Sequence, residues 1–416
     1  MEKTKPFNIP KKLFVQAYRL VKANAGAAGV DQESIADFEK NLKDNLYKLW
    51  NRMSSGCYFP APVKAVPIPK KSGGERLLGV PTVGDRIAQM VARLVFEPSV
   101  EAIFLSDSYG YRPKKSALDA IGVTRQRCWY YDWVLEFDIK GLFDNLSHDL
   151  MMKAVRKHTQ EAWVILYVER WLKAPMQRPD GTMIERTRGT PQGGVISPVL
   201  SNLFLHYVFD VWMQKNHPNK PWCRYADDGL VHCNTQREAE EMLNALRSRF
   251  AECGLELHPD KTQIVYCKDG ARRKDYPNKS FDFLGYTFRA RLCKNTKRNS
   301  MFMNFTPAVS KAAIKSMRAK TKKYNLRNRT DLSLEEIARW YNPVLNGWLN
   351  YYGKYTRSAM YPVWRHFNKT LIAWAMRKYK SLQRHKTRAS IFLEGIAEKQ
   401  PNLFAHWRAG MQGGFA

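Results

Sequence analysis

The sequence predicts an α+β fold, in which helices pack on one face of a sheet, followed by a separate all-α domain. Up to Lys294, short apolar runs typical of strands alternate with segments of helical spacing, whereas only helical spacing follows. The chain has 416 residues and is 44% hydrophobic. That length and composition predict two or three folded domains with substantial cores.

The first predicted elements are helices and a hairpin. Residues 10–49 read as helices separated by a loop at 24–31, where glycines supply turn conformations. Two strand-like runs over 63–80 flank a Ser-Gly-Gly turn at 72–74, which predicts a hairpin with basic residues near its tip. Helical spacing returns over 85–96.

The middle of the chain supplies the predicted sheet. Residues 133–139 form an apolar run containing a carboxylate near its end, which is typical of a buried strand. Residues 197–212 have helical spacing, 222–233 read as a hairpin, and 237–253 as an amphipathic helix. A final strand is predicted over 281–288.

Three helices are predicted in the remainder. Residues 306–324 are rich in lysine and have helical spacing. Ser333 and Glu336 have the spacing of a capping box, which predicts the start of a helix over 334–352. A third helix is predicted over 358–379.

The charge of the chain predicts a polyanionic partner. Lys and Arg number 68 against 38 Asp and Glu, a formal net charge of +30. Residues 291–416 hold 25 of these cations and only five acidic residues. Nucleic acid is the first candidate for the partner and an anionic membrane surface the second.

Cysteine usage and the absence of targeting patterns predict a cytoplasmic, bacterial protein. Seven scattered cysteines include no Cys-x-x-Cys pair, which is typical of free thiols in a reducing compartment and not of a zinc module. The sequence has no signal-peptide pattern and no 18-residue apolar span.

Adjacent carboxylates on a tight turn are the strongest chemical signal. Asp227 and Asp228 repel each other unless a cation lies beside them, although a solvated acidic turn is the ordinary alternative. Asp138, at the end of an apolar strand, is the best third ligand for a pair of divalent cations. The alternative for Asp138 is a helix N-cap, a role that Ser147 and Asp149 could also fill.

Five segments in order resemble the motifs of reverse transcriptases. They are LEFDIKGLFD at 135–144, GTPQGGVISP at 189–198, YADD at 225–228, GLELHPDKT at 254–262 and FLGY at 283–286.

Other segments resemble the group II intron reverse transcriptases, also called maturases. In the first half of the chain they are the loop 24–31, the segment 68–86 (which contains IPK at 68–70, GVPT at 79–82, Asp85 and Arg86) and SYGYRP at 108–113. In the second half they are WYNP at 340–343, GWLNYYG at 347–353 and LFAHW at 403–407. A Cys/His-rich endonuclease segment is missing, so the resemblance is to the bacterial, endonuclease-lacking type.

The resemblance implies a right-hand polymerase followed by an α-helical thumb, or maturase X domain. Residues 1–128 would form an N-terminal extension and the fingers, and 129–295 the palm, with 150–188 returning to the fingers. Residues 296–384 would form the thumb and 385–416 a short basic extension.

The resemblance also assigns a metal site and a nucleotide site. Asp138, Asp227 and Asp228, with the Ile139 carbonyl, would hold two Mg²⁺, for which Mn²⁺ could substitute. The residues expected at the dNTP are Lys70 and Arg76 on the triphosphate, Gln192 on the nucleotide or template, Phe143 as a gate against the 2′-hydroxyl, and Lys261 as an acid on pyrophosphate. The ordinary alternatives are a solvated basic hairpin for Lys70 and Arg76, core packing for Phe143 and a solvated turn for Lys261.

Nucleic-acid contacts are expected from both halves of the chain. Tyr225 would pack under the primer terminus, and the other expected contacts are Arg112, Lys311, Lys315, Arg318, Lys322 and Lys323. The aromatic residues of the C-terminal helices are expected to be mostly core.

The implied function is RNA-directed DNA synthesis together with maturase activity, in which the protein assists splicing of and retrohoming by its intron RNA. The expected partners are intron RNA, a DNA primer or target, and dNTPs, with no membrane. The rivals are another prokaryotic reverse transcriptase (of a retron, a diversity-generating element or a CRISPR-linked system) and a splicing-only RNA-binding maturase. Monomer and homodimer remain open.

Overall fold

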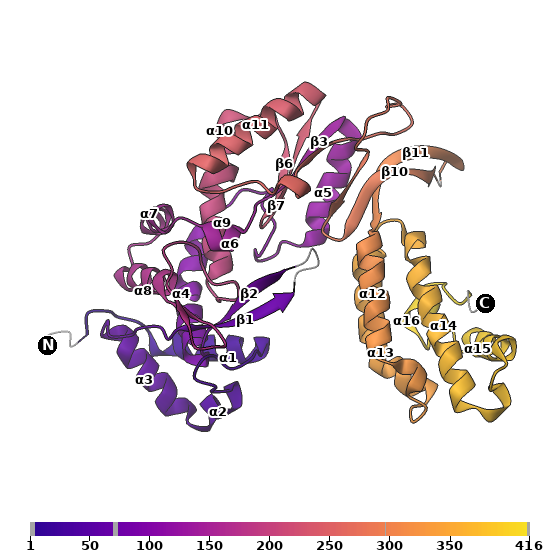
Figure 1. Ribbon diagram of the computed structural model, residues 1–416, viewed down its shortest axis with the longest axis horizontal. Helices are drawn as coiled ribbons and strands as arrows, with labels where there is room; N and C mark the ends of the chain where they lie inside the picture. Colours follow the sequence, from indigo (N-terminus) through magenta and orange to yellow (C-terminus); the bar gives the residue numbers. More distant parts are fainter. Residues whose placement is uncertain (1–4, 70–73, 296, 414–416) are drawn as a thin grey trace. The chain divides into compact units, whose positions relative to one another are not determined.

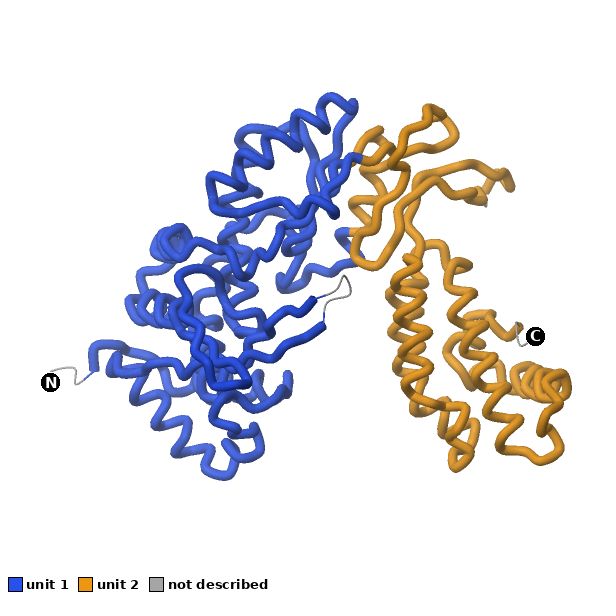
Figure 2. The backbone as a smooth tube through the Cα atoms, viewed as in Figure 1, with its two compact units in different colours: residues 1–120, 135–264 blue, residues 121–134, 265–416 orange. Residues whose placement is uncertain are grey.

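The computed structural model describes residues 5–69, 74–295 and 297–413, and the chain divides into two compact units (Figure 2). One unit comprises residues 1–120 and 135–264, and the other comprises 121–134 and 265–416. Both α-helices and β-sheets are present, as the sequence predicts. In the described part of the chain, no helix is both long and apolar enough to cross a membrane.

The first unit begins with helices and a small sheet (Figure 1). Its elements up to residue 101 are α1 (Lys11–Asn24), α2 (Ile35–Lys40), α3 (Leu42–Ser54), β1 (Val63–Pro69), β2 (Glu75–Val80) and α4 (Val83–Glu101). The strands β1 and β2 pair antiparallel, with Ile68 opposite Arg76, so the predicted hairpin is confirmed. Short strands β4 (Met176–Gln177) and β5 (Met183–Ile184) extend this sheet in the order β2-β1-β4-β5.

A second sheet carries the acidic residues. Its order is β6-β7-β3-β8, with β3 (Trp133–Asp138), β6 (Trp222–Tyr225), β7 (Asp228–Cys233) and β8 (Gln263–Tyr266). The burial of β3 is nearly continuous, because Val134, Leu135 and Phe137 are each at most 1% exposed. The predicted strand over 133–139 and the predicted hairpin over 222–233 are therefore confirmed.

Helices precede, separate and follow the strands of this sheet along the chain. They are α5 (Ala117–Tyr130), which runs across the division between the units, α6 (Leu142–Asn145), α7 (His148–His158), α8 (Ala162–Lys173), α9 (Ser197–Leu205), α10 (Val211–Asn216) and α11 (Gln236–Glu252). The predicted single helix over 197–212 is interrupted by a π-helical turn at His206–Asp210.

The second unit contains a three-stranded sheet that the sequence predicts incompletely. The strands β9 (Ser280–Phe283), β10 (Tyr286–Asn295) and β11 (Ser300–Val309) are arranged β11-β10-β9. The predicted strand over 281–288 is wrong at its centre, since Leu284 and Gly285 have positive φ and turn the chain between β9 and β10. Residues 306–309 were predicted as helix but belong to β11, where Val309 pairs with Tyr286.

Helices complete the second unit: α12 (Lys311–Lys323), α13 (Leu334–Tyr352), α14 (Tyr361–Lys378), α15 (Lys386–Lys399) and α16 (Ala405–Arg408). The predicted capping box is confirmed, because Ser333 Oγ accepts from the Glu336 amide and the Glu336 carboxylate accepts from the Ser333 amide. Trp364, Trp374 and Trp407 are at most 1% exposed and form part of a core shared by these helices. Most of the aromatic residues here are thus structural.

Candidate active site

The Tyr-Ala-Asp-Asp segment forms the turn between β6 and β7. Tyr225 pairs with Asp228, which leaves Ala226 and Asp227 at the tip. Ala226 has a φ of 58°, in the left-handed region that residues with a Cβ seldom adopt. The backbone of Gly110 lies against this tip, and a Cβ at Gly110 would lie only 2.4 Å from the Ala226 amide nitrogen. Surrounding contacts therefore hold the turn in an otherwise unfavourable conformation.

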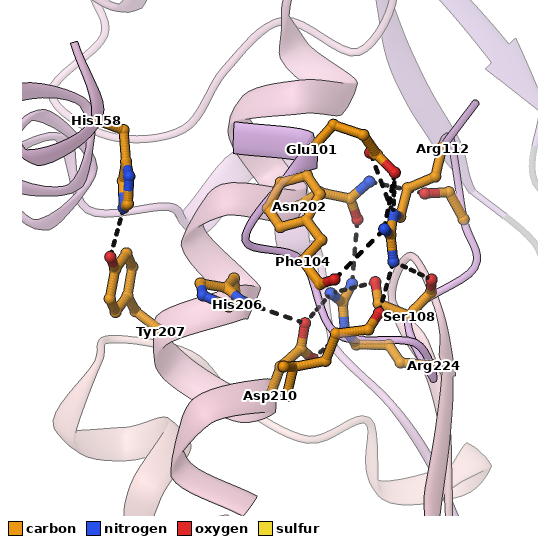
Figure 3. Close-up of polar contacts among 12 residues, drawn as sticks. Glu101, Phe104, Ser108, Arg112, His158, Asn202, His206, Tyr207, Asp210 and Arg224 are labelled. Atoms are coloured by element: carbon orange, nitrogen blue, oxygen red, sulfur yellow. Dashed lines mark hydrogen bonds and ion pairs between the residues drawn. The ribbon is translucent and has the colours of Figure 1, made fainter. Parts of the chain in front are cut away.

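The buried guanidinium of Arg224 braces the same turn (Figure 3). Its Nε and Nη2 donate to the two carboxylate oxygens of Asp210 at 2.8 and 2.7 Å. Nη1 donates to the Ala226 carbonyl at 3.2 Å, and Nη2 also donates to Ser108 Oγ at 2.8 Å. A bidentate pair with additional acceptors satisfies a buried charge that would otherwise be costly. Arg224 therefore ties the catalytic turn to the helix that contains Asp210.

The π-helical turn explains why Asp210 faces Arg224. Asn202 Oδ1 also accepts from Arg224, at 3.2 Å, although Asn202 lies eight residues before Asp210. In an uninterrupted α-helix, residues eight apart lie roughly 80° apart around the axis. The wider turn at His206–Asp210 takes up an extra residue and brings both side chains to Arg224, a use of π turns that is frequent at functional sites.

Arg112, predicted to contact nucleic acid, lies inside the protein instead (Figure 3). Its side chain is 6% exposed and forms a salt bridge with Glu101 at 2.7 Å. The remaining donors bind the carbonyls of Phe104, Leu105 and Ser108. Its geometry therefore does not support the predicted nucleic-acid contact. Arg112 stabilises the loop that packs against the catalytic turn.

Asp138 lies beside the turn at the end of β3. The neighbouring Ile139 amide donates to the Asp227 carbonyl at 3.2 Å, which joins the two segments. The alternative of a helix N-cap does not apply to Asp138, because the N-cap of α6 is Gly141 and that of α7 is Ser147. The ring of Phe137 fills the space over Gly229, where a Cβ would lie 2.1 Å from it. Asp138 and Asp228 thus lie on adjacent strands, and Asp227 lies in the turn beside them.

Asp138 is buried, Asp227 and Asp228 are partly buried, and the three carboxyl groups are close enough to influence one another. Burial raises the pKa of Asp227, and the charge of Asp138 adds to the effect. Burial, followed by the charges of Asp227 and Asp138, raises the pKa of Asp228 to about 7. Buried negative charge of this kind is relieved by a cation.

Lys261 supplies a positive charge at this site. It belongs to a 3₁₀ turn at Pro259–Lys261, and its Nζ lies 2.8 Å from Asp138 Oδ2. Burial opposes its charge, but the hydrogen bond to Asp138 and the nearby carboxylates raise the pKa of Lys261 above its usual value. Lys261 was predicted from the motif at 254–262, and the fold places it on the carboxylates.

The donor set fits divalent cations, although the carboxylates are not already gathered around one point. Within residues 5–69, 74–295 and 297–413, no three His, Cys, Asp or Glu side chains are arranged as a ready metal cluster. The Asp138 carboxylate binds Lys261 instead. Three neighbouring carboxylates are nevertheless the hard oxygen ligands that Mg²⁺ and Mn²⁺ prefer.

The predicted nucleotide-binding segments lie against one another in the first unit. The Gly79 amide of β2 donates to the Gln192 carbonyl at 2.7 Å, and the Thr190 amide donates to the Phe143 carbonyl at 2.7 Å. Gly193 has a φ of 119°, and a Cβ there would lie 2.4 Å from the Gly79 carbonyl oxygen. The loop at 189–194 therefore joins β2 to α6. Lys70 lies outside the described residues.

Tyr111 is a site residue that the motif comparison did not single out. It has a φ of 58° and is 49% exposed. Partial burial raises the pKa of Tyr111, followed by the charge of Asp227, while Arg76 acts in the opposite direction. The positive φ cannot be read from a Tyr-Gly-Tyr sequence, and it leaves an exposed aromatic ring near Asp227.

The predicted RNA contacts on α12 share one face. Lys311, Lys315, Arg318 and Lys322 are exposed at intervals of three and four residues, whereas Ala313, Met317 and Thr321 on the other side are buried. Arg318 also donates to the Pro362 carbonyl at 3.0 Å. Lys323 is exposed at the end of the helix. The arrangement is an exposed basic face on a packed helix.

Comparisons with known proteins agree with these features. Residues 68–288 match the model of the family described as reverse transcriptase (RNA-dependent DNA polymerase), and residues 314–392 match the group II intron, maturase-specific domain.

Named relatives extend the likeness to most of the chain. Protein YkfC of Escherichia coli K12 is 32% identical over 299 residues, which cover 61% of this chain and 77% of that protein. The group II intron-encoded protein LtrA of Lactococcus lactis subsp. cremoris is 24% identical over 429 residues, covering 82% of this chain and 68% of LtrA. The putative COX1/OXI3 intron 1 protein of Saccharomyces cerevisiae is 29% identical, covering 62% of this chain and 31% of that protein. The chain belongs to the reverse transcriptase (RNA-dependent DNA polymerase) family, and its maturase-specific domain identifies it as a group II intron reverse transcriptase/maturase.

Proposed function

We propose that this enzyme copies its intron RNA into DNA by two-metal nucleotidyl transfer, with Asp138, Asp227 and Asp228 as the ligands of two Mg²⁺. The observation that carries the proposal is that the end of β3 and the β6–β7 turn bring these three carboxylates together, Asp138 buried and the other two partly buried, with the pKa of Asp228 raised to about 7. Bound Mg²⁺, or Mn²⁺ in its place, would supply charge neutralisation on the attacking and leaving oxygens. The Ile139 carbonyl is a further proposed ligand.

The protein groups around the carboxylates then have separate tasks. Arg224 and Asp210 hold the backbone of the turn that carries Asp227 and Asp228, so that this backbone is already ordered when substrate binds. Lys261 forms a salt bridge with Asp138 and would donate a proton to the departing pyrophosphate. Tyr225, at the end of β6, would support the primer terminus.

The deoxynucleotide is proposed to bind beside the β1–β2 hairpin. Arg76 lies on β2, and Lys70 is assigned with it to the triphosphate. Gln192, on the loop bonded to β2, would contact the nucleotide or template. Phe143 is half-buried on α6 next to that loop, which supports its role as the gate that excludes a 2′-hydroxyl.

Residues 296–384, which contain α12, α13 and α14, are proposed to form the thumb, or maturase X domain. The match to the maturase-specific domain over residues 314–392 and the basic face of α12 support this assignment. Through this surface the protein would bind intron RNA, assist its splicing and promote copying at a DNA target. The fingers, palm and C-terminal extension keep their predicted bounds, and we propose a bacterial cytoplasmic location.

Primer extension tests the proposal directly. The parent and Asp227→Asn are assayed on a heteropolymeric RNA template with a DNA primer and Mg²⁺, with dNTPs and rNTPs in separate reactions. We expect full-length DNA from dNTPs only, and a loss of activity of at least about 10²-fold in the variant, because one metal ligand is weakened. A folded parent that binds structured RNA but makes no DNA would instead identify a splicing-only maturase.

A further inference from the structure

The second unit contains a cavity at the C-terminal end of α12. Its volume is about 360 Å³, within the range of about 300–1,000 Å³ typical of small-molecule sites. It lies between α12, the 3₁₀ turn at Leu326–Asn328 and one face of α14. Its walls are formed by Thr321, Lys322, Asn325, Leu326, Arg327, His366, Lys369, Thr370 and Ala373.

The cavity is lined by cations and by no acidic residue. Lys322, Arg327 and Lys369 are exposed at its rim, and the part of the chain that the structure describes gives none of the three an ion pair. Lys322 is favourably placed at a helix C-terminus, where a cation complements the macrodipole. Arg327 and Lys369 have no such partner, so an anion at the rim would relieve the repulsion among the three.

The interior of the cavity has an apolar side and one unsatisfied polar atom. Leu326 and Ala373 provide apolar surface, whereas the hydroxyls of Thr321 and Thr370 already donate to backbone carbonyls. His366 Nε2 is buried and has no hydrogen-bond partner among the described residues. Burial, together with the charges of Arg318 and Lys322, lowers the pKa of His366, so a neutral imidazole faces the ligand. Buried polar groups in native proteins are nearly always paired, which points to a missing partner.

We propose that this cavity binds one unstacked nucleotide of structured RNA. Its phosphate would lie among Lys322, Arg327 and Lys369, and its base would lie on Leu326 and Ala373 with an edge hydrogen-bonded to His366. Proteins read RNA mainly through nucleotides that are splayed out of helices, because side chains cannot enter the deep groove of an A-form duplex. The inference rests on the proposed binding of intron RNA and adds a single-nucleotide site to an otherwise sequence-independent basic face.

The test compares two RNAs of equal length, a duplex with one bulged nucleotide and the fully paired duplex, by fluorescence anisotropy with the full chain. The variants are Lys369→Glu, Ala373→Phe, which fills the cavity without changing its charge, and the control Arg388→Glu on α15, outside the cavity. We expect the parent to prefer the bulged RNA and Lys369→Glu to weaken that complex about tenfold more than Arg388→Glu does. Ala373→Phe should abolish the preference while duplex binding stays unchanged. Circular dichroism and thermal unfolding confirm that each variant is folded.

Equal losses on both RNAs for Lys369→Glu and Arg388→Glu would overturn the proposal in favour of a general basic face. The imidazole NMR signal of His366, assigned with His366→Gln, distinguishes the source of the phosphate. A shift with bulged RNA but not with millimolar inorganic phosphate supports a nucleotide site, whereas a shift with phosphate alone and no RNA preference overturns it. Primer extension by the parent is measured separately, so loss of polymerase function would be recognised independently of this RNA preference.

Discussion

At the scale of single residues, the chemistry of the site is local in sequence but its support is not. Asp227 and Asp228 are recognisable because they are adjacent, and Asp138 because it ends an apolar strand. The groups that hold them are far apart: Ser108, Asp210 and Arg224 meet only through tertiary contacts. From the sequence alone, Arg224 could equally be an exposed arginine in a strand, because no neighbouring residue in the chain identifies Asp210 as its partner. The sequence therefore predicts the proposed metal ligands but does not predict the contacts of Arg224 that hold the turn.

The contact between Arg224 and Asp210 predicts that Asp210→Asn impairs catalysis without removing any proposed metal ligand. The substitution leaves the buried Arg224 charge without its carboxylate, which costs about 3–5 kcal/mol when a buried pair is broken. We expect kcat in primer extension to fall at least tenfold (about 1.4 kcal/mol in the barrier), with the KM for dNTP nearly unchanged. Thermal unfolding of the same sample measures the loss of stability.

The companion variant Arg224→Lys keeps the charge but cannot form the bidentate contact. It should remain folded and still show the reduced kcat. If kcat of both variants falls only in proportion to the unfolded fraction at the assay temperature, Arg224 and Asp210 stabilise the fold and do not position the turn.

The predicted gate at Phe143 gives a residue-scale test of nucleotide choice. Phe143→Ala removes the ring that would meet a 2′-hydroxyl, so the ratio of kcat/KM for rNTP to that for dNTP should rise about tenfold or more. Phe209→Ala, a change to another buried ring in the same unit, should lower stability without altering the ratio. An unchanged ratio in a folded Phe143→Ala enzyme would assign Phe143 to packing alone.

At the scale of elements, prediction succeeds where side-chain periodicity and caps are local, as in α13 with its Ser333 box. It fails where pairing across the chain decides the outcome. Residues 306–309 have helical spacing with the lysines that follow, yet they pair with residues 286–289 of β10, about 20 residues earlier in the chain. The loop at 189–194 was identified by its glycines, but its bond to β2 is visible only in the fold.

The basic face of α12 predicts a specific salt dependence. Reversing Lys311, Lys315 and Arg318 to Glu removes up to three phosphate contacts, so the slope of log K against log[salt] for RNA binding should decrease by about 2–3. The matched control reverses Lys386, Arg388 and Lys399 on α15, which are also exposed. Filter binding over a salt series measures both. Identical slopes in the two triple variants would mean that charge is spread over the unit and that α12 is not a particular RNA contact.

At the scale of the whole molecule, the protein combines a catalytic unit with a basic helical unit that has its own core. The last 126 residues hold 25 Lys and Arg against five acidic residues, whereas Asp138, Asp227 and Asp228, the proposed metal ligands, lie in the first unit. Polymerisation needs hard carboxylates that attract cations, and RNA binding needs cations that attract phosphate. Along the sequence, the excess of basic residues is therefore concentrated away from these carboxylates. This division of charge was visible in the sequence, but the stability of the second unit depends on contacts that were not.

The core of that second unit contains a histidine that makes its stability depend on pH. Asn368 Oδ1 accepts from Trp407 Nε1 at 3.1 Å, and it lies 2.7 Å from His406 Nε2. Since an indole N–H only donates, the Asn368 oxygen is an acceptor and His406 Nε2 must carry the proton. Its Nδ1 is then buried without a partner. Complete burial lowers the pKa of His406 to about 3, because a second proton would have no acceptor.

A histidine whose pKa is lower in the folded protein than in the unfolded chain stabilises the fold at pH values above the pKa of the unfolded chain. This contribution to stability is lost as the pH falls. Between pH 6.5 and 3 the unfolded chain takes up a proton that folded His406 refuses, so the free energy of unfolding should fall by up to about 5 kcal/mol. Trp364 and Trp407, which contact His406, report the transition by fluorescence. His406→Phe keeps a ring among these neighbours and removes the titration, so its unfolding midpoint should depend less on pH than that of the parent. His385→Phe, at an exposed histidine, is the control. If His406→Phe and the parent lost stability in parallel from pH 6.5 downward, the acid sensitivity of this core would have to come from other groups.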